Sequence, residues 1–396
     1  MKIAIVTHTV ARGDGQGRVN LEIVQAALAA GFEITLVASR VEPALLNDSR
    51  VRWIEIPVGR LPTRLLQYQS FAVRAGLWLS RHRSEFDIVH LNGFIAWARG
   101  DVNSVHFVHQ GFLRSGFYPF KFFGSASQAY QVMFNRLNAR LERWAFKRTR
   151  VIVPVSHKVA TEVAAHGLDV NAMQVIHNGV DNTEFCPGDA ERARFNLPAD
   201  AFMLLFAGDL RVSRKNLDTV LDALERLPAH IHVAVAADIS GENPYAATVA
   251  ARGLVSRVHF LGMIRTMPAV MRSVDAFVFP SRYEAMSLVL LEALSSGLPV
   301  VTATSAGGAE VIDPACGVVL DDPNDVDGLV AAIAELAAQP ERTREMGQAA
   351  RRIALTLGWD SMGERYLALY RRLAAAPNYQ TSPGNAETTQ RNTGSI

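Results

Sequence analysis

The sequence predicts an α/β protein made of two doubly wound domains. Short apolar runs of the kind typical of buried parallel strands recur along the 396 residues. Longer segments with helical periodicity separate these runs, and the alternation restarts after residue 181. A chain of this length is also expected to form about two domains. We therefore expect one Rossmann-like sheet in each half of the chain.

The strands and helices follow in a regular order. In the first half we expect strands at 2–7, 33–38, 51–56, 87–91, 103–108 and 151–155, with helices at 19–30, 64–82 and 128–147. In the second half we expect strands at 202–206, 231–236, 257–261, 275–279, 299–302 and 317–320, with helices at 217–227, 288–296, 326–337 and 359–375. The expected domains are 1–180 and 181–357, and the polar segment 376–396 is expected to be a disordered tail.

Composition narrows the class of protein. Two cysteines, Cys186 and Cys316, cannot build a disulfide framework and fit a reducing, cytoplasmic compartment. The first apolar run is too short for a signal peptide, and no run approaches the ~18 apolar residues of a membrane span. Residues 1–180 hold 21 Lys and Arg against 12 Asp and Glu, whereas residues 181–396 hold 19 against 26. The basic first half is therefore expected to meet an anionic partner.

The strongest functional signal lies where a buried strand gives way to a helix. The strand ends at Phe279, and Ser287 is a suitable N-cap for a helix that begins at Leu288. Glu284 lies in the loop before this helix, and Glu292 lies in its second turn. Free backbone N–H groups at the start of a helix bind anions, phosphate above all. The plainer alternative is a solvated loop glutamate and a surface helix glutamate.

The first strand is followed by a glycine-rich loop that contains Gly13, Gly15 and Gly17. A dinucleotide-binding fingerprint would need Gly-x-Gly-x-x-Gly, but Arg18 occupies the third glycine position. The next strand also lacks the acidic residue that would hold a ribose, which disfavours a nicotinamide enzyme. A simple tight turn remains the alternative for these glycines.

The order strand, Pro-Ser, Glu, helix cap, Glu, Gly-x-Pro, strand resembles the Glu-x7-Glu segment of retaining nucleotide-sugar glycosyltransferases of family 4, which have the two-domain GT-B fold. The resemblance implies that Glu284 contacts the donor sugar and that Glu292 holds the ribose hydroxyls. The diphosphate would meet the backbone amides of Ser287, Leu288 and Val289. That family usually has Gly at position 287, so the Ser287 side chain narrows the space beside the sugar and leaves the donor sugar open.

The resemblance extends to a basic loop that starts at Gly208. It implies that Arg214 and Lys215 neutralise the diphosphate, with Arg211 as a stand-in for a family arginine. Preorganised cations suit this role because the leaving diphosphate gains negative charge in the transition state. A solvated basic loop is the alternative. The backbone at Met263, after strand 257–261, falls where the family receives the base.

In the first half the resemblance concerns the acceptor side of the cleft. It implies that Gly15 and Gly17 lie near the donor phosphate and the acceptor, and that a His at the end of strand 103–108 lies at the reaction centre. His106 fits this position best, and His109 is the runner-up. A structural His is the alternative, because a His at a strand end is more often structural than functional.

The resemblance implies two domains that face a cleft, a last helix at 358–375 that crosses back to the first domain, and a retaining hexosyltransferase. The donor would be a nucleoside-diphosphate sugar, with UDP or GDP expected, and neither a metal nor another cofactor is expected. Asp325 and Asp327 are expected to open a helix and not to bind a metal. The alternatives are a non-catalytic nucleotide-binding relic and a glycoside hydrolase that uses Glu284 and Glu292.

Residues 111–150 combine aromatic and basic side chains. Six aromatic residues crowd a short loop, and the whole segment holds eight Lys and Arg with a single acid, Glu142. Arg136 and Arg140 share a helix face, which Arg143 extends. This composition suits an anionic membrane surface, so we expect a glycan or lipid-linked acceptor and peripheral contact with the inner face of the cell membrane. Core aromatics beside a solvated helix are the alternative; nucleic acid is not expected as a partner.

Overall fold

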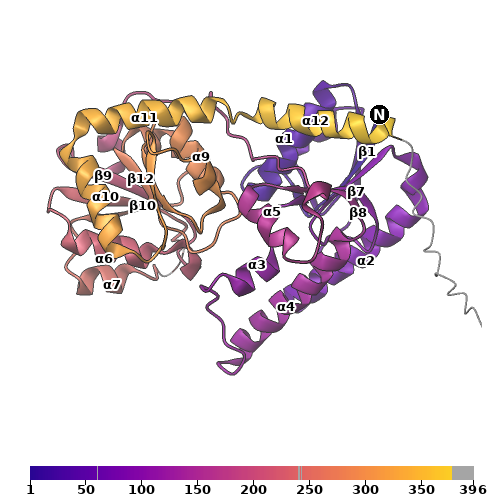
Figure 1. The fold of residues 1–396 in the computed structure, drawn as a ribbon, viewed down its shortest axis with the longest axis horizontal. Helices are drawn as coiled ribbons and strands as arrows, with labels where there is room; N and C mark the ends of the chain where they lie inside the picture. Colours follow the sequence, from indigo (N-terminus) through magenta and orange to yellow (C-terminus); the bar gives the residue numbers. More distant parts are fainter. Residues whose placement is uncertain (60, 240, 242, 377–396) are drawn as a thin grey trace, which may run out of the picture.

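The computed structural model describes residues 1–59, 61–239, 241 and 243–376, and Figure 1 shows two α/β halves side by side. The first half holds one sheet with the spatial order β5 (Val51–Glu55), β3 (Glu33–Ala38), β1 (Lys2–Val6), β6 (Ile88–Asn92), β7 (Gly100–Val105) and β8 (Thr149–Pro154). The second holds β11 (Val258–Gly262), β10 (Ile231–Ala236), β9 (Phe202–Ala207), β12 (Ala276–Phe279), β13 (Val300–Ala303) and β14 (Gly317–Leu320). All pairings within both sheets are parallel.

Both sheets have the same doubly wound strand order. In each, the first strand of the half lies centrally, the chain winds to one edge, and it then returns to wind to the other edge. The order reverses between β1 and β6 in the first sheet and between β9 and β12 in the second. Ligands of open α/β sheets bind at such points, outside the carboxyl ends of the strands. The predicted fold class is confirmed, and the loops after β9 and β12 occupy one of these positions.

Helices flank the two sheets (Figure 1). The first half has α1 (Gly15–Ala29), α2 (Arg64–His82), α3 (His109–Arg114), α4 (Ala126–Phe146) and α5 (His157–Ala164). The second half has α6 (Leu217–Arg226), α7 (Ala246–Ala251), α8 (Met267–Arg272), α9 (Leu288–Ser295), α10 (Val326–Ala338) and α11 (Pro340–Leu355). Asp325 caps α10 by accepting a hydrogen bond from the Gly328 amide at 2.9 Å, as expected of a helix start.

Several sequence predictions need correction, and the short helices α3, α5, α7 and α8 were not predicted. α1 begins at Gly15, four residues before the predicted start, because Asp14 caps it by accepting from the Gly17 amide. β7 ends at Val105 and not at residue 108, because the neighbouring strand β8 ends beside it at Pro154. The prediction missed α11 entirely. Its buried face is built largely from small residues, which give little apolar periodicity, and Gly347 lies so close to Gly297 that a Cβ would collide with that backbone.

The last helix, α12 (Trp359–Ala375), crosses back and packs on α1, as predicted (Figure 1). A buried polar network fastens it to the first sheet. His90 of β6 lies 2.7 Å from the Tyr370 hydroxyl and 2.7 Å from Oγ of Ser104, which is 2.8 Å from the Tyr366 hydroxyl. Buried polar groups are tolerated when they satisfy one another in this way. The predicted disordered tail spans 376–396, and from residue 377 onwards it lies outside the residues that the structure describes.

The segment 111–150 divides into a buried and an exposed part. Phe112 is buried and packs against Tyr118, whereas Phe123 is 96% exposed at the loop before α4. Phe112 is therefore a core aromatic residue, which was the alternative interpretation of this segment, whereas Phe123 is not. Among the described residues, no helix has the length and apolar character needed to cross a bilayer.

Candidate functional site

The basic loop after β9 is shaped by Gly208 and Asn216. The alkyl chain of Lys215 runs beside Gly208, where an added Cβ would lie 3.2 Å from it. Asn216 adopts a left-handed backbone conformation with φ of 66°, which Asn tolerates better than most residues. Its side chain donates to the carbonyls of Pro280 and Pro323 at 2.9 and 2.7 Å. This loop is therefore tied to the loop after β12.

Those ties bring three predicted site residues together. Oε1 of Glu284 accepts from the Arg214 guanidinium and lies 2.7 Å from Nζ of Lys215. Arg214 also donates to the Tyr283 carbonyl at 3.0 Å, and Ser281 Oγ donates to the Arg214 carbonyl at 2.9 Å. The Glu284 side chain is only 12% exposed. Two cations and one carboxylate thus leave a net positive charge at the carboxyl end of β9 and β12.

The helix start beside this cluster carries free amides. Ser287 occupies the N-cap position of α9, as predicted, but its side chain makes no capping hydrogen bond. Leu288 and Val289 form the first turn, whose N–H groups have no partner within the helix. Gly15 of the glycine-rich loop faces this turn, since a Cβ there would lie 3.8 Å from Leu288. Gly17 instead packs against the Ala11 carbonyl, which an added Cβ would approach to 2.8 Å.

Glu292 has a different environment from Glu284. Burial, with a further contribution from the nearby Glu184 carboxylate, raises the pKa of Glu292 from 4.5 to about 7, against the opposing field of Arg18. No hydrogen bond to its carboxylate is found among the residues that the structure describes. Arg18, which belongs to α1 of the first half, approaches Asp181 and Glu184 at 3.6 and 4.0 Å. Sequence reasoning used Arg18 only to reject a dinucleotide fingerprint and missed its place near Glu292.

The two candidate histidines after β7 are now distinguished. Burial lowers the pKa of His106 to about 4, so its ring is neutral at pH 7, and its Nε2 is buried without a hydrogen-bond partner. His109 instead pairs with the carboxylate of Glu142 through Nδ1 at 2.6 Å and through its own amide at 3.0 Å. His8, at the end of β1, also has a buried unpartnered nitrogen, and burial lowers its pKa to about 4. Sequence reasoning did not single out His8.

Two residues that were predicted to bind the sugar donor lie apart from the cluster of Arg214, Lys215 and Glu284. Arg211 is 68% exposed and pairs with Asp209 at 2.9 Å, while Arg214 and Lys215 contact Glu284. Met263 follows Gly262, which ends β11 with φ of 73°, and it is 67% exposed. The Arg211 guanidinium therefore does not contact Glu284, and the Met263 side chain points to solvent.

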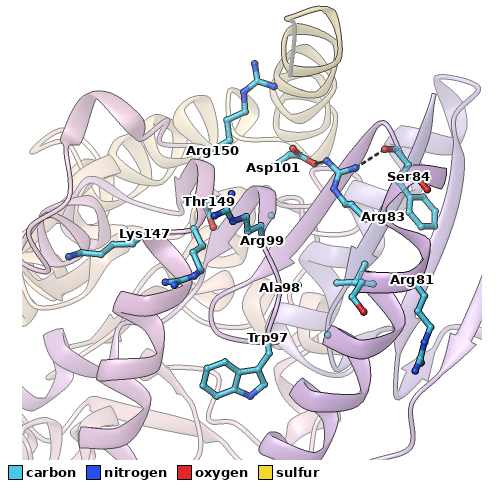
Figure 2. A pocket seen from close by; sticks show the side chains of 16 residues that line it. Arg81, Arg83, Ser84, Trp97, Ala98, Arg99, Asp101, Lys147, Thr149 and Arg150 are labelled. Atoms are coloured by element: carbon cyan, nitrogen blue, oxygen red, sulfur yellow. Dashed lines mark hydrogen bonds and ion pairs between the residues drawn. The ribbon is translucent and has the colours of Figure 1, made fainter. Parts of the chain in front are cut away.

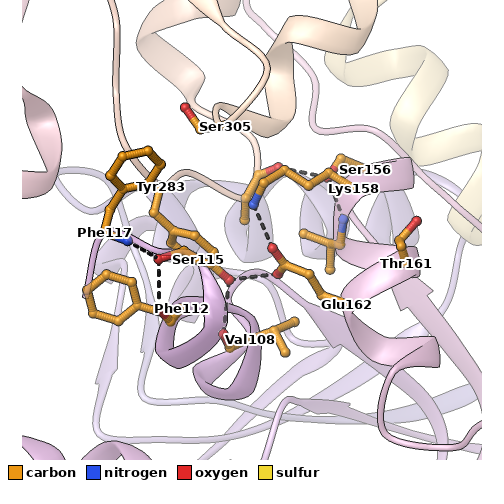
Figure 3. Close-up of polar contacts among 12 residues, drawn as sticks. Val108, Phe112, Ser115, Phe117, Ser156, Lys158, Thr161, Glu162, Tyr283 and Ser305 are labelled. Atoms are coloured by element: carbon orange, nitrogen blue, oxygen red, sulfur yellow. Dashed lines mark hydrogen bonds and ion pairs between the residues drawn. The ribbon is translucent and has the colours of Figure 1, made fainter. Parts of the chain in front are cut away.

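Tyr283 fastens the Glu284 loop to the first half (Figure 3). Its ring is fully buried, and its hydroxyl lies 2.9 Å from the Val108 carbonyl and 2.7 Å from Glu162 of α5. Lys158 pairs with Glu162 at 2.7 Å and places Nζ 4.0 Å from the Tyr283 ring centre. Burial and the Glu162 carboxylate raise the pKa of Tyr283. No sequence motif indicated this contact, because its partners are distant in the chain.

A large cavity lies elsewhere, at the start of β7 and β8 (Figure 2). Its volume is about 1180 Å³, and it contains none of the predicted site residues. It is lined by six cations, namely Arg81, Arg83, Arg99, Lys147, Arg148 and Arg150. The single acid in its lining, Asp101, pairs with Arg83 at 2.7 Å. This edge is opposite to the one where ligands of such sheets bind.

Comparisons with known proteins find relatives in sequence and in fold. The D-inositol 3-phosphate glycosyltransferase of Xylanimonas cellulosilytica is 26% identical over 391 residues, which covers 88% of this chain and 89% of that protein. Sucrose-phosphate synthase from Thermosynechococcus elongatus shares the fold with a TM-score of 0.76 at 20% identity, over 94% of this chain and 98% of that one. HepE of Anabaena, solved in complex with UDP and glucose, has a TM-score of 0.70 at 19% identity, over 95% and 100% of the two chains.

Two family models divide the chain between them. The model for glycosyltransferase family 4 matches residues 13–184, and the model for glycosyl transferases group 1 matches residues 201–339. Each match contains one of the two sheets almost completely, and the second contains Arg214, Lys215, Glu284 and Glu292. The chain therefore belongs to the family-4 type of GT-B glycosyltransferases, enzymes that transfer a sugar from a nucleotide sugar to an acceptor.

Proposed function

We propose that this enzyme binds a nucleoside-diphosphate sugar in the crevice outside β9 and β12 and transfers the sugar with retention of anomeric configuration. The observation that carries the proposal is the convergence of Arg214, Lys215 and Glu284 beside the start of α9. Fixed cations and free helix amides favour a diphosphate, and they favour it more as the glycosidic bond breaks and negative charge develops. Glu284 then faces the sugar.

The ribose and base are assigned to the neighbouring residues. Glu292 accepts hydrogen bonds from the ribose hydroxyls, which gives its otherwise unpartnered carboxylate the donors that stabilise its ionised form. Met263, which is an exposed residue, receives the base through its backbone. UDP is the first nucleotide to test, since HepE of Anabaena, which shares this fold, was solved with UDP. GDP is the second.

The transfer is proposed to be independent of a divalent metal, with Arg214 and Lys215 supplying the charge that a metal would supply. His106 lies on the acceptor side as a neutral imidazole, because its pKa is about 4. Its Nε2 has no hydrogen-bond partner but is buried, so an acceptor hydroxyl can reach it only if neighbouring side chains move. By its resemblance to the family, the departing phosphate takes the proton from the acceptor hydroxyl.

Release of nucleoside diphosphate from a panel of UDP- and GDP-sugars, in the presence of EDTA, tests this function. The wild type should release diphosphate, Glu284→Gln should lose most of this activity, and Arg211→Ala should retain it. NMR of the product at its anomeric carbon tests retention. No release with any donor would favour the non-catalytic relic, and cleavage of glycans without a nucleotide would favour the hydrolase.

We further propose that the first half meets an anionic membrane on which a lipid-linked or envelope glycan acceptor is presented. Exposed cations lie along one face of α4 at Arg136, Arg140 and Arg143, and Lys147 follows at the C-cap. Near its start, the exposed apolar side chains are Phe122, Phe123 and Met133, with exposed fractions of 49%, 96% and 54%. Cations and apolar side chains together are what binding to an anionic interface requires.

Sedimentation with vesicles tests the membrane proposal. The wild type should bind phosphatidylglycerol vesicles, bind phosphatidylcholine vesicles much less, and dissociate as salt rises. Phe123→Ser and Arg140→Glu should weaken binding without changing the melting temperature, since both side chains are exposed. Equal binding of both variants and the wild type would contradict the proposal.

A further inference from the structure

Three potential metal ligands from both halves of the chain converge at one point outside the donor site. His157 begins α5, His177 lies after β8, and Glu310 belongs to a short 3-10 helix, η6 (Gly307–Val311), of the second half. One ligand atom from each of the three lies within 4.8 Å of the others. Nε2 of His177 is 2.6 Å from Oε1 of Glu310, and the two imidazole rings have centroids 6.0 Å apart at 75°.

The proposed donor chemistry does not use this cluster. Glu310 reaches the first half, where its carboxylate accepts from the amides of His157 and Lys158 at 2.9 and 3.3 Å. The cluster opens to solvent through His157, which is exposed, whereas the Glu310 side chain is 20% exposed, so an ion can enter past His157 without unfolding. It is nevertheless linked to the donor loop, because the amide of Gly307 donates to the Glu284 carbonyl at 2.9 Å.

A plain ion pair explains only two of the three side chains. His177 and Glu310 would lie close together if protonated His177 simply paired with the carboxylate. The imidazole of His157 makes no hydrogen bond among the described residues, and it lies beside the His177 ring. Two imidazoles and a carboxylate are a donor set typical of Zn²⁺ and of the neighbouring transition metals. Mg²⁺ and Ca²⁺ prefer oxygen ligands and fit poorly.

We propose that His157, His177 and Glu310 form a transition-metal site of the Zn²⁺ class that ties the two halves of the enzyme together. The metal would not take part in sugar transfer. It would replace the proton shared by His177 and Glu310 and recruit His157, with solvent completing the coordination. Since η6 is joined to the Glu284 loop, an ion at this site would also restrain that loop relative to α5.

Titration of the full chain, first freed of metal with a chelator, tests the site. Calorimetry with ZnCl₂ should show one saturable equivalent, and the bound ion should raise the melting temperature because it binds the folded chain. His157→Ala should lower Zn²⁺ affinity at least about tenfold and abolish the rise in melting temperature. His157 is exposed, so this variant should melt like the wild type in EDTA.

His230→Ala is the matched control, because His230 is an exposed histidine outside the cluster. It should keep wild-type affinity, whereas Glu310→Gln should lose affinity as His157→Ala does. MgCl₂ should give no saturable binding at comparable concentrations. Unchanged Zn²⁺ affinity in His157→Ala, or the absence of saturable binding to the wild type, would overturn the proposal.

Discussion

Glu284 and Glu292 lie eight residues apart on one segment, yet their surroundings are opposite. Glu284 is held by two cations, Arg214 and Lys215, that come from the loop after β9. Glu292 has no such partner among the residues that the structure describes, and burial together with Glu184 raises its pKa to about 7. One carboxylate is stabilised by the protein alone, whereas the other is kept in an unfavourable environment.

This difference indicates what each residue contributes. A carboxylate that is already paired is positioned before the donor arrives, which suits a group that must meet a reacting sugar in a fixed geometry. A buried and unpartnered carboxylate costs stability and is expected where a ligand supplies the missing hydrogen-bond donors. Changes at Glu284 should therefore affect turnover more than donor binding, and changes at Glu292 should do the reverse.

The largest effect is expected for Glu284→Gln. Turnover should fall about 10²- to 10³-fold, the range seen when a group that stabilises a transition state is removed. Diphosphate affinity should stay constant or rise, because Arg214 and Lys215 lose their anionic partner. Steady-state kinetics with nucleotide titration separate the two quantities. A loss of affinity with unchanged turnover would reverse the assigned roles.

Lys215→Ala should give the next largest effect. Nucleoside diphosphate affinity should fall roughly tenfold or more, because a hydrogen bond to a charged group contributes about 1.5–3 kcal/mol. Arg211→Ala is the control, since Arg211 pairs with Asp209 on the surface and should change affinity by less than about twofold. Calorimetric titration measures both. Equal losses in the two variants would indicate a diffuse basic loop.

Glu292→Gln should have two effects of opposite sign. Donor affinity should fall several-fold because an amide is a weaker acceptor for the ribose hydroxyls. Stability should rise at high pH. In the wild type, the pKa of Glu292 is higher in the folded than in the unfolded chain, so the cost of ionising it is absent below about pH 4.5, grows as pH rises, and is complete above about pH 7.

The full ionisation cost at Glu292 is about 3 kcal/mol, from a pKa raised by roughly 2.5 units. Urea unfolding at pH 4.5 and pH 8 measures it: Glu292→Gln should resemble the wild type at pH 4.5 and exceed it at pH 8. A variant with equal stability gains at both pH values would mean that ionisation is not the cause. A gain confined to pH 8 without loss of donor affinity would separate Glu292 from the donor site.

The smallest effect is expected for Ser287→Gly. Ser287 occupies the N-cap of α9 without a side-chain hydrogen bond, so its replacement should cost little stability. Removal of its side chain widens the space beside the donor sugar and should change the preference among sugars by a few-fold. Competition between two sugar nucleotides with the same base measures this ratio. An unchanged ratio would mean that Ser287 does not contact the sugar.

The sequence predicted those parts of the site that lie within one strand, loop and helix. Glu284, Ser287 and Glu292 follow from local pattern, and both sheets could be assigned because buried parallel strands are continuous apolar runs. The contacts of Tyr283 with Val108 and Glu162, and the place of Arg18 near Glu292, join residues more than 100 positions apart. No local pattern encodes such pairs. α11 was missed for another reason, since its buried face is made largely of small residues.

Nucleotide binding to the wild type and to Glu292→Gln, without metal, tests the central claim most directly. Thermal unfolding with UDP, GDP, ADP and their sugars should show a clear rise for one base. A ligand at ~100 times its dissociation constant adds about 2.7 kcal/mol to the stability of the wild type, and the variant should gain less at the same concentration. No rise with any nucleotide in folded protein, or equal rises in both proteins, would contradict the account.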